Sequence, residues 1–317
     1  MFRSMFAGLA GCGLVALATP ASATFSIAAC DARKTCGVAV ATNNLAVGAS
    51  VAYAQGGVGA VVTQFETNPH YGPKGLALLA RGQDPQAVVT TLLAEDGGFE
   101  DQDQSWRQVA AVAADGRAFA FTGAEAAASA WAGHQAQTGY SVQGNGLAGP
   151  RVLEAMKAAF TQASGPLPDR LMAALEAGEA AGGQTTGRMS AALLVRTAEG
   201  GWSDVDLRVD ASAAPVAELR RLLNLRQANE RLAAAERAAR RGKPDVARSE
   251  ITAAIGLGGD WDRVWRRAAR LRMTMGDRAE AVQALAAMHR LNPNWAKMER
   301  DDPLFAPVRE DPALSRF

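Results

Sequence analysis

Residues Thr24–Thr42, TFSIAACDARKTCGVAVAT, carry the clearest structural pattern of the chain. Its two ends are apolar and contain strand-forming residues, whereas the polar centre, Asp31–Thr35, is typical of a turn. The pattern predicts two antiparallel strands joined by that turn. Cys30 and Cys36 flank the turn, and two thiols at this spacing can pair if the chain is exported, which is argued from residues 1–23 below. We expect a disulfide, because no histidine or third cysteine lies close by to make a metal or redox site.

This hairpin also predicts a register. Facing residues of an antiparallel pair have a constant sum of sequence numbers, so a Cys30–Cys36 pair places Thr24 opposite Thr42. Asn43 follows directly, and polar side chains therefore gather at the end away from the turn. We expect Thr42 and Asn43 to line a site beside Thr24. A solvated turn at this position is the alternative that the sequence leaves open.

Residues 1–23 have the features of a secretory signal peptide. Arg3 precedes an apolar run over 5–18, and the small residues up to Ala23 form the A-x-A pattern that a signal peptidase reads. We therefore expect a periplasmic or secreted protein that begins at Thr24. The alternative is a lipoprotein acylated on Cys12, which would leave Thr24 inside the chain.

Cleavage after Ala23 would give Thr24 an unusual chemistry. A hydroxyl is a poor nucleophile unless a base removes its proton. The free α-amine of the same residue has an ordinary pKa near 8 and can act as that base. Thr24 is therefore our candidate nucleophile.

The composition sets limits on the other functions. The chain has 317 residues, 48% of them hydrophobic, which suits about two globular domains. A net charge of +1 gives no indication of nucleic-acid binding, and no later apolar run reaches the roughly 18 residues of a membrane span. With only three scattered histidines, we expect no metal site, and we expect no cofactor. The sequence leaves open whether the protein forms a homo-oligomer.

Within residues 24–212, blocks of strands alternate with pairs of helices. Such an order favours an α+β fold in which two sheets lie between helical layers. Further strands are expected over 47–54, 58–63, 106–114, 118–122, 190–196 and 205–209, and helices over 75–81, 85–95, 150–163 and 167–180. Asp115-Gly116 is a strong hairpin turn signal, and 139–149 is expected to be a glycine-rich segment.

Residues 213–317 are predicted to form an all-helical domain. Sliding the chain by 34 residues aligns Gly242 with Gly276 and Ile251 with Leu285, which is the period of a helix pair. The segment resembles the tetratricopeptide family over residues 225–294. That resemblance implies binding of a protein partner, whereas an ordinary helical bundle is the alternative.

Many motifs of the first domain resemble one family, domain-of-unknown-function family 1028. They are TFSI at 24–27, AVGA at 46–49, GVGAVVTQ at 57–64, NP at 68–69, YGP at 71–73, WAGH at 131–134, YSVQGN at 140–145, LAG at 147–149, SAAL at 190–193 and LRVD at 207–210. The resemblance implies a four-layer αββα sandwich of the N-terminal-nucleophile (Ntn) hydrolase type. It also implies that Thr24 becomes the first residue, since cytoplasmic members begin Met-Thr-Phe-Ser. The family's substrate is not established, so the resemblance supplies no reaction.

Further site residues are expected around Thr24. Asn145, between two glycines, is our second catalytic candidate, as a donor to an oxyanion. The expected substrate-binding residues are Thr42, Asn43, Gln64, Asn68, His70, Tyr71, Gln143, Arg188 and Ser190, with Arg188 holding a carboxylate. A plain turn at Asn145, a stabilised loop around His70 and a surface ion pair of Arg188 are the alternatives.

The sequence therefore predicts an exported Ntn-type hydrolase that cleaves an amide or related acyl bond in a small molecule or peptide. The competing hypothesis is a catalytically silent binding or scaffold protein, whose helical repeat recruits a partner.

Overall fold

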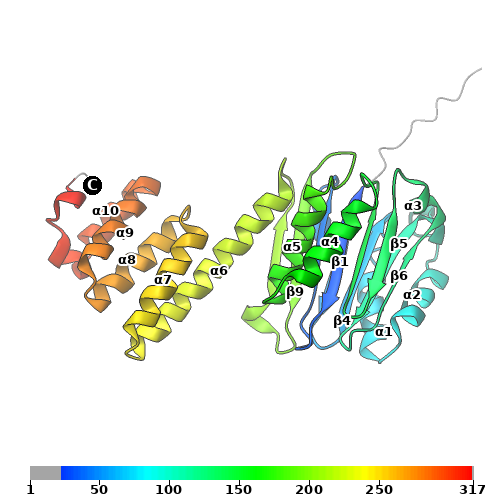
Figure 1. The fold of residues 1–317 in the computed structure, drawn as a ribbon, viewed down its shortest axis with the longest axis horizontal. Coiled ribbons are helices and arrows are strands. Elements are labelled where there is room, and N and C mark those ends of the chain that lie inside the picture. Colours follow the sequence, from blue (N-terminus) through cyan, green and yellow to red (C-terminus); the bar gives the residue numbers. More distant parts are fainter. Residues whose placement is uncertain (1–22, 316–317) are drawn as a thin grey trace, which may run out of the picture. The chain divides into compact units, whose positions relative to one another are not determined.

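The computed structural model describes residues 23–315 of the chain, so the expected signal peptide and Cys12 lie outside the described residues (Figure 1). The chain divides into two compact units. The first ends at Asp206 and also takes in Asp210–Ala213, while the second contains Leu207–Val209 and everything described from Ala214 on. The architecture is mixed α/β, with two antiparallel sheets and a C-terminal helical region.

The larger sheet has six strands in the order β10-β9-β2-β1-β8-β7. They are β1 (Thr24–Cys30), β2 (Cys36–Thr42), β7 (Gly133–Gln137), β8 (Tyr140–Asn145), β9 (Ser190–Arg196) and β10 (Val205–Val209). The hairpin of β1 and β2 has the predicted register, with Thr24 opposite Thr42 and Cys30 opposite Cys36. On its other side β1 pairs with β8, which places Asn145 opposite Thr24. The residue expected as the nucleophile therefore begins a central strand.

The second sheet has four strands in the order β3-β4-β5-β6. They are β3 (Ala52–Gln55), β4 (Gly59–Phe65), β5 (Arg107–Ala113) and β6 (Ala118–Thr122). The predicted strand over 47–54 is wrong in its first half, where Val47–Ala49 form a 3-10 turn. The backbone turns there because Ser190 Oγ accepts a hydrogen bond from Val47 N at 3.0 Å and donates one to Asn44 O at 2.6 Å.

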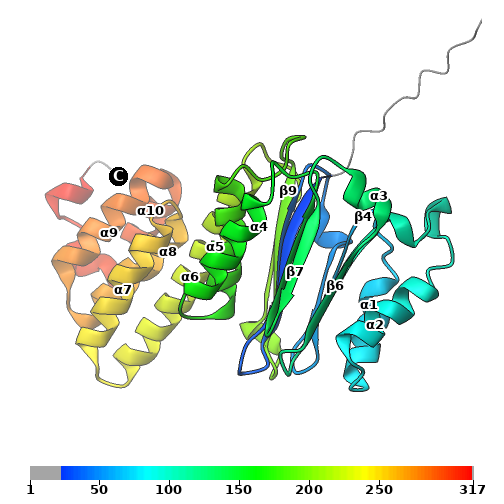
Figure 2. The same cartoon turned by 45° about the vertical axis from the view of Figure 1, so that its right-hand side comes forward.

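Helices cover the outer face of each sheet (Figure 2). Helices α1 (Tyr71–Ala80) and α2 (Pro85–Ala94) contact the four-stranded sheet, whereas α5 (Leu167–Ala180) contacts the six-stranded one and α4 (Arg151–Gln162) packs beside α5. Side chains alternate along β1, so Phe25 faces α5, where it lies against Gly178, and Ala28 faces the other sheet. The space between the sheets is apolar near the disulfide, where Val38, Val40, Val62 and Val112 are buried.

One strand and one α-helix of the first unit were not predicted from the sequence, β7 and the short α3 (Ala124–Ala128). The glycine-rich segment over 139–149 also contains β8, a strand that pairs on both sides. Its Gly144 is required by packing, because a Cβ there would lie 2.5 Å from the Leu147 side chain. Glycine in this segment therefore allows close contact between elements.

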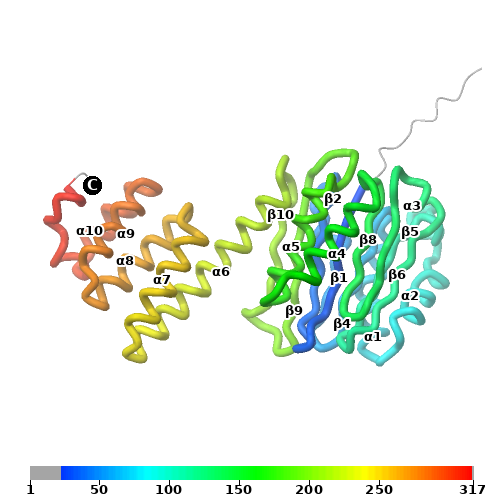
Figure 3. Tube along the Cα trace, in the orientation of Figure 1, coloured from blue at the N-terminus to red at the C-terminus, as the bar shows by residue number. Residues whose placement is uncertain are grey.

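The second unit consists of helices packed in sequence order (Figure 3). They are α6 (Pro215–Arg240), α7 (Pro244–Gly258), α8 (Asp262–Met275), α9 (Arg278–Leu291) and α10 (Pro293–Asp301), followed by 3-10 turns at Pro303–Val308 and Pro312–Leu314. Positions 34 residues apart are equivalent, since Gly242 and Gly276 both have left-handed φ values, of 66° and 84°. Ile251 and Leu285 are both fully buried. Among the described residues, no helix is long and apolar enough to cross a membrane.

Candidate functional site

The side chain of Thr24 points into the space between the two sheets and is 3% exposed. Ser26, two residues on and therefore on the same face of β1, donates a hydrogen bond of 2.7 Å to Gln64 Oε1 on β4. Thr24 Oγ1 lies 3.0 Å from Thr42 Oγ1 on β2. The hairpin register that the disulfide supports thus places two hydroxyl groups side by side.

The direction of this hydrogen bond follows from its neighbours. Thr42 Oγ1 lies 2.8 Å from the carbonyl oxygen of Ala23, which can only accept, so Thr42 uses its single hydrogen there. The Thr24 hydroxyl must then donate to Thr42. The backbone N–H of Asn43 donates to the same Ala23 oxygen at 3.3 Å. The carbonyl before Thr24 is therefore bound by two donors.

The rest of Ala23 is held equally closely. Its N–H donates to Asn43 Oδ1 at 3.0 Å. The orientation of the Asn43 amide is fixed by Thr186, whose Oγ1 accepts from Asn43 Nδ2 at 2.6 Å. Gly146 lies against the Ala23 side chain, and a Cβ on it would lie 2.6 Å from the Ala23 Cβ. Thr42, the last residue of β2, and Asn43, which follows it, were both expected beside Thr24. Both contact the Ala23–Thr24 peptide.

A buried amide network lies between the sheets next to Thr24. Gln64 Nε2 donates to Thr24 O at 3.4 Å and to Gln108 Oε1 at 2.7 Å. Asn145 Nδ2 donates to the same Gln108 oxygen at 2.9 Å. Gln108 itself donates to Gly144 O at 3.0 Å. The expected residues Gln64 and Asn145 are therefore brought together with Thr24, through a glutamine that sequence reasoning missed.

The network extends from Gln108 to a histidine. Gln108 Nε2 donates to Thr122 Oγ1 at 3.0 Å, and Thr122 Oγ1 lies 2.8 Å from His134 Nδ1. Burial lowers the pKa of His134 below its ordinary value, so the ring is neutral at pH 7. A neutral ring can accept the Thr122 hydrogen at Nδ1, which makes the chain of hydrogen bonds continuous.

Two amides beside Thr24 have atoms without a partner among the described residues. Asn145 Oδ1 and both amide atoms of Gln143 are buried and form no hydrogen bond there. Buried polar atoms of this kind are rare in folded proteins and call for an explanation. We expected Asn145 to donate to an oxyanion. One hydrogen of its Nδ2 is donated to Gln108 Oε1, so this role would fall to the second hydrogen of the same group, while its oxygen can only accept.

The expected residues Asn68 and Tyr71 belong to a different cluster, centred on Asp96. Asn68 Nδ2 and Tyr71 Oη both donate to Asp96 Oδ1 at 2.9 Å. Arg107, only 1% exposed, forms an ion pair of 3.0 Å with Asp96 Oδ2. His70 lies edge-on to Phe99, with ring centroids 5.7 Å apart. These contacts stabilise the loops after β4 and α2.

The charges of this cluster determine the ionisation of Asp96. Burial alone would raise the pKa of Asp96, but hydrogen bonds from Arg107, Asn68 and Tyr71 outweigh it and hold that pKa below its ordinary value. Burial and the hydrogen bond to Asp96 raise the pKa of Tyr71, which stays protonated. Neither residue is therefore placed to exchange protons near pH 7.

The last two expected residues have structural partners. Ser190 holds the backbone of residues 44–47, as described above, and Arg188 forms an exposed ion pair with Glu179.

Sequence reasoning missed Ser26, Asp96, Arg107 and Gln108. A polar residue in a strand that is otherwise apolar is a signal that could have found Ser26 and the pair Arg107-Gln108.

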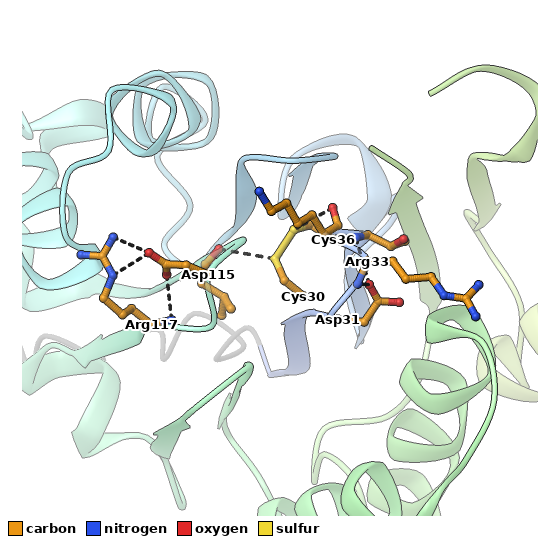
Figure 4. Close-up of a disulfide and its surroundings, with 9 residues drawn as sticks. Cys30, Asp31, Arg33, Cys36, Asp115 and Arg117 are labelled. Carbon is orange, nitrogen blue, oxygen red and sulfur yellow. Dashed lines mark hydrogen bonds and ion pairs between the residues drawn. A yellow bond between two sulfur atoms is a disulfide. The ribbon is translucent and has the colours of Figure 1, made fainter. Parts of the chain in front are cut away.

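The predicted disulfide is present at the opposite end of the hairpin, where Cys30 is bonded to Cys36 (Figure 4). The turn between them is closed by Asp31, whose carboxylate accepts hydrogen bonds from the backbone N–H groups of Arg33 and Thr35 at 2.9 and 3.0 Å. A disulfide between these cysteines is consistent with a location outside the cytoplasm.

Comparison with known proteins shows which family the chain belongs to. The model of a family of unknown function, DUF1028, matches residues 24–219. The chain belongs to the DUF1028 family. The match begins at Thr24, the residue described above.

A solved structure agrees with the assignment to DUF1028. The chain is 33% identical to the crystal structure of protein SPO2555 from Silicibacter pomeroyi, which is assigned to the same family. The match covers 63% of this chain and 84% of that one, with a TM-score of 0.57. None of the curated proteins matches this DUF1028 chain.

Proposed function

We propose that this protein is an exported hydrolase of the Ntn type, which uses Thr24 as its nucleophile on an amide or related acyl bond. The observation that carries the proposal is the environment of Thr24. Its hydroxyl donates to Thr42, which in turn donates to the carbonyl that precedes Thr24. A nucleophile, a hydrogen-bond acceptor for its hydroxyl and two donors on an acyl oxygen are thus grouped at one strand terminus.

The layered architecture supports the same proposal. Helix α5 and its neighbour α4, the six-stranded sheet, the four-stranded sheet, and helices α1 and α2 follow one another, which is the αββα order of the Ntn hydrolases that the DUF1028 family resembles. In that class the nucleophile begins a strand of the sandwich and supplies its own α-amine as base. Thr24 begins β1 between β2 and β8, as this mechanism requires.

The reaction needs only water besides the substrate. The Thr24 amine accepts the hydroxyl proton, Oγ1 bonds to the acyl carbon, and the oxyanion that forms is stabilised by the Thr42 hydroxyl and the Asn43 N–H. The amine then delivers the proton to the leaving nitrogen as the C–N bond breaks. Water hydrolyses the resulting ester, which releases a carboxylate and restores Thr24. Asn145 Oδ1, which is opposite Thr24 and only accepts, orients the amine in this scheme.

A covalent trap tests this proposal. Methanesulfonyl fluoride should add one sulfonyl group to the mature protein, on the peptide that begins TFSI, as seen by mass spectrometry. The Thr24→Ala variant should give no adduct, whereas Thr24→Ser, which keeps hydroxyl and amine, should be labelled. Absence of any adduct at Thr24 in the wild type would leave a catalytically silent scaffold as the better account.

The helical unit supports a second, compatible function in binding a partner. Between α7, α8 and α9 it has an open surface pocket of about 490 Å³ that is lined by Trp265, Arg272 and Arg290 among others. Positions 34 residues apart are equivalent in the helices, as in the tetratricopeptide repeats that the sequence resembles. Affinity capture with the helical unit as part of the full chain, compared with an Arg272→Glu variant, tests this role. Equal capture by both proteins would exclude this pocket.

A further inference from the structure

We infer that the site holding Ala23 is the acyl subsite of the mature enzyme, and that it selects substrates whose acyl side is an N-acylated alanyl or glycyl residue. We define the acyl subsite as Thr42, Asn43 and Gly146. The inference rests on the proposed function, since it assigns a substrate class to the same nucleophile.

The contacts of Ala23 show what the acyl subsite recognises. One amino-acid residue offers an N–H, a side chain and a carbonyl, and the subsite binds all three. The N–H is bound by Asn43 Oδ1, and the carbonyl by Thr42 Oγ1 and Asn43 N. Alanine at position 23 is already favoured by the signal-peptidase pattern, so its identity alone carries no information. The residues that surround Ala23 do carry information about which side chain the acyl subsite accepts.

The size of the acyl subsite is limited by Gly146. The Cα of Ala23 lies 3.2 Å, and its Cβ 2.6 Å, from the place where a Gly146 Cβ would stand. Ala23 is fully buried. Gly146 is held from both sides, since its N–H donates to Ser129 Oγ at 3.2 Å and its carbonyl accepts from Thr185 N at 2.9 Å. The Ala23 methyl therefore packs against a fixed backbone, and a γ-carbon directed toward Gly146 would have to displace it.

The acyl subsite stays next to the nucleophile after cleavage. The carbonyl carbon of Ala23 is bonded to the nitrogen of Thr24, and this nitrogen and Oγ1 belong to one residue. An acyl carbon must come within about 3–3.5 Å of Oγ1 in order to react. The space that Ala23 leaves therefore adjoins Oγ1, and the acyl group of a substrate enters it with its carbon displaced from the former Ala23 carbon, because that point is within bonding distance of the free amine. The oxyanion then faces the same two donors.

The order of substrate preference tests the inference. Mature protein is mixed with p-nitrophenyl esters of N-acetylated glycine, alanine, valine and leucine, whose small activated leaving group makes few demands on the other subsite. We expect release of p-nitrophenol and an acyl adduct on Thr24 for glycine and alanine, with kcat/KM at least tenfold lower for valine and leucine. The isobutyryl ester, which lacks the N–H, should also react at least tenfold more slowly than the alanyl ester.

A variant of the subsite wall makes the test specific. Gly146→Ala should lower kcat/KM for the alanyl ester at least tenfold more than for the glycyl ester. Gly57→Ala is the matched control, because Gly57 has a similar left-handed φ of 74° but no atom within 4 Å of the place where its Cβ would stand. The Gly57→Ala variant should leave the ratio of kcat/KM for the alanyl and glycyl esters unchanged.

The two proposals fail in different ways. Equal rates for all four esters, with methanesulfonyl fluoride still labelling Thr24, would overturn the acyl subsite and leave the nucleophile in place. A preference for valine or leucine would also overturn it. Failure of both the esters and the sulfonyl fluoride to modify Thr24 would overturn the proposed function, and the subsite with it.

Discussion

Gln108 Oε1 accepts a hydrogen bond of 2.9 Å from Asn145 Nδ2, which ties the strand opposite Thr24 to the second sheet. The same oxygen accepts from Gln64 at 2.7 Å, so the orientation of the Gln108 amide is fixed. Asn145 must in turn present its oxygen away from Gln108. This glutamine therefore positions the residue that we propose to orient the Thr24 amine.

Replacing Gln108 with leucine should reduce both stability and activity. The change leaves the amides of Gln64 and Asn145 without their acceptor in a buried space, which costs about 1–3 kcal/mol for each such group. Urea unfolding measures the loss of stability, and ester turnover should show a fall in kcat that exceeds any change in KM. The matched control is Gln86→Leu at an exposed position of α2. Activity unchanged in Gln108→Leu would remove Gln108 from the account.

Arg107→Met should destabilise the first unit strongly. Removal of the guanidinium leaves Asp96 buried without its cation, and breaking a buried ion pair typically costs about 3–5 kcal/mol. The exposed pair of Arg117 with Asp115 is a matched control, since Arg117→Met should change the free energy of unfolding by about 0–1 kcal/mol. Similar effects of the two substitutions in urea unfolding would contradict the importance of burial.

The same ion pair predicts a loss of stability in acid. Because the folded protein holds the pKa of Asp96 below the ordinary value near 4, the ionised carboxylate contributes its stabilisation fully above that value. The contribution is lost as the pH falls through the lowered pKa. Thermal melts between pH 6 and 2 should therefore show a steeper decline in the wild type than in Asp96→Asn, which is less stable throughout. Equal declines of the melting temperature in the two proteins would show that this ion pair does not cause the loss of stability in acid.

Removing the disulfide should have a moderate effect on stability. A bond that closes a loop of this short length contributes about 2 kcal/mol by the loop-entropy estimate. The double variant Cys30→Ser with Cys36→Ser should unfold at a lower urea concentration than the oxidised wild type and at about the same concentration as the reduced one. The hydrogen bonds at the Thr24 end should keep the register, so activity should persist. Loss of activity with the fold intact would show that the bond is needed to align Thr24.

The sequence predicted those parts of the fold that depend on local pattern. The alternation of Thr24–Thr42 and the two cysteines determine the hairpin and its register, and α5 has its predicted bounds, Leu167–Ala180. The short turn at Val47–Ala49 was missed because its cause, Ser190, comes about 140 residues later.

Much of the candidate site could not be predicted for the same reason. Thr24, Thr42 and Asn43 follow from one hairpin. Gln108 is linked to Thr24 through Gln64, and meets Asn145, only because a second sheet stacks on the first. No spacing in the chain indicates which polar residue of β5 will meet Asn145. The expected pocket residue Tyr71 likewise meets Asp96 through packing of α1 against the loop after α2.

The chain terminus is the feature on which the account depends most directly. If export removes residues 1–23, Thr24 gains the free amine that serves as base, and the acyl subsite loses Ala23. N-terminal sequencing of the protein recovered from the periplasm or medium measures this in one step. The account predicts the sequence TFSIAA. A protein that starts at an acylated Cys12, or at any residue other than Thr24, would contradict it.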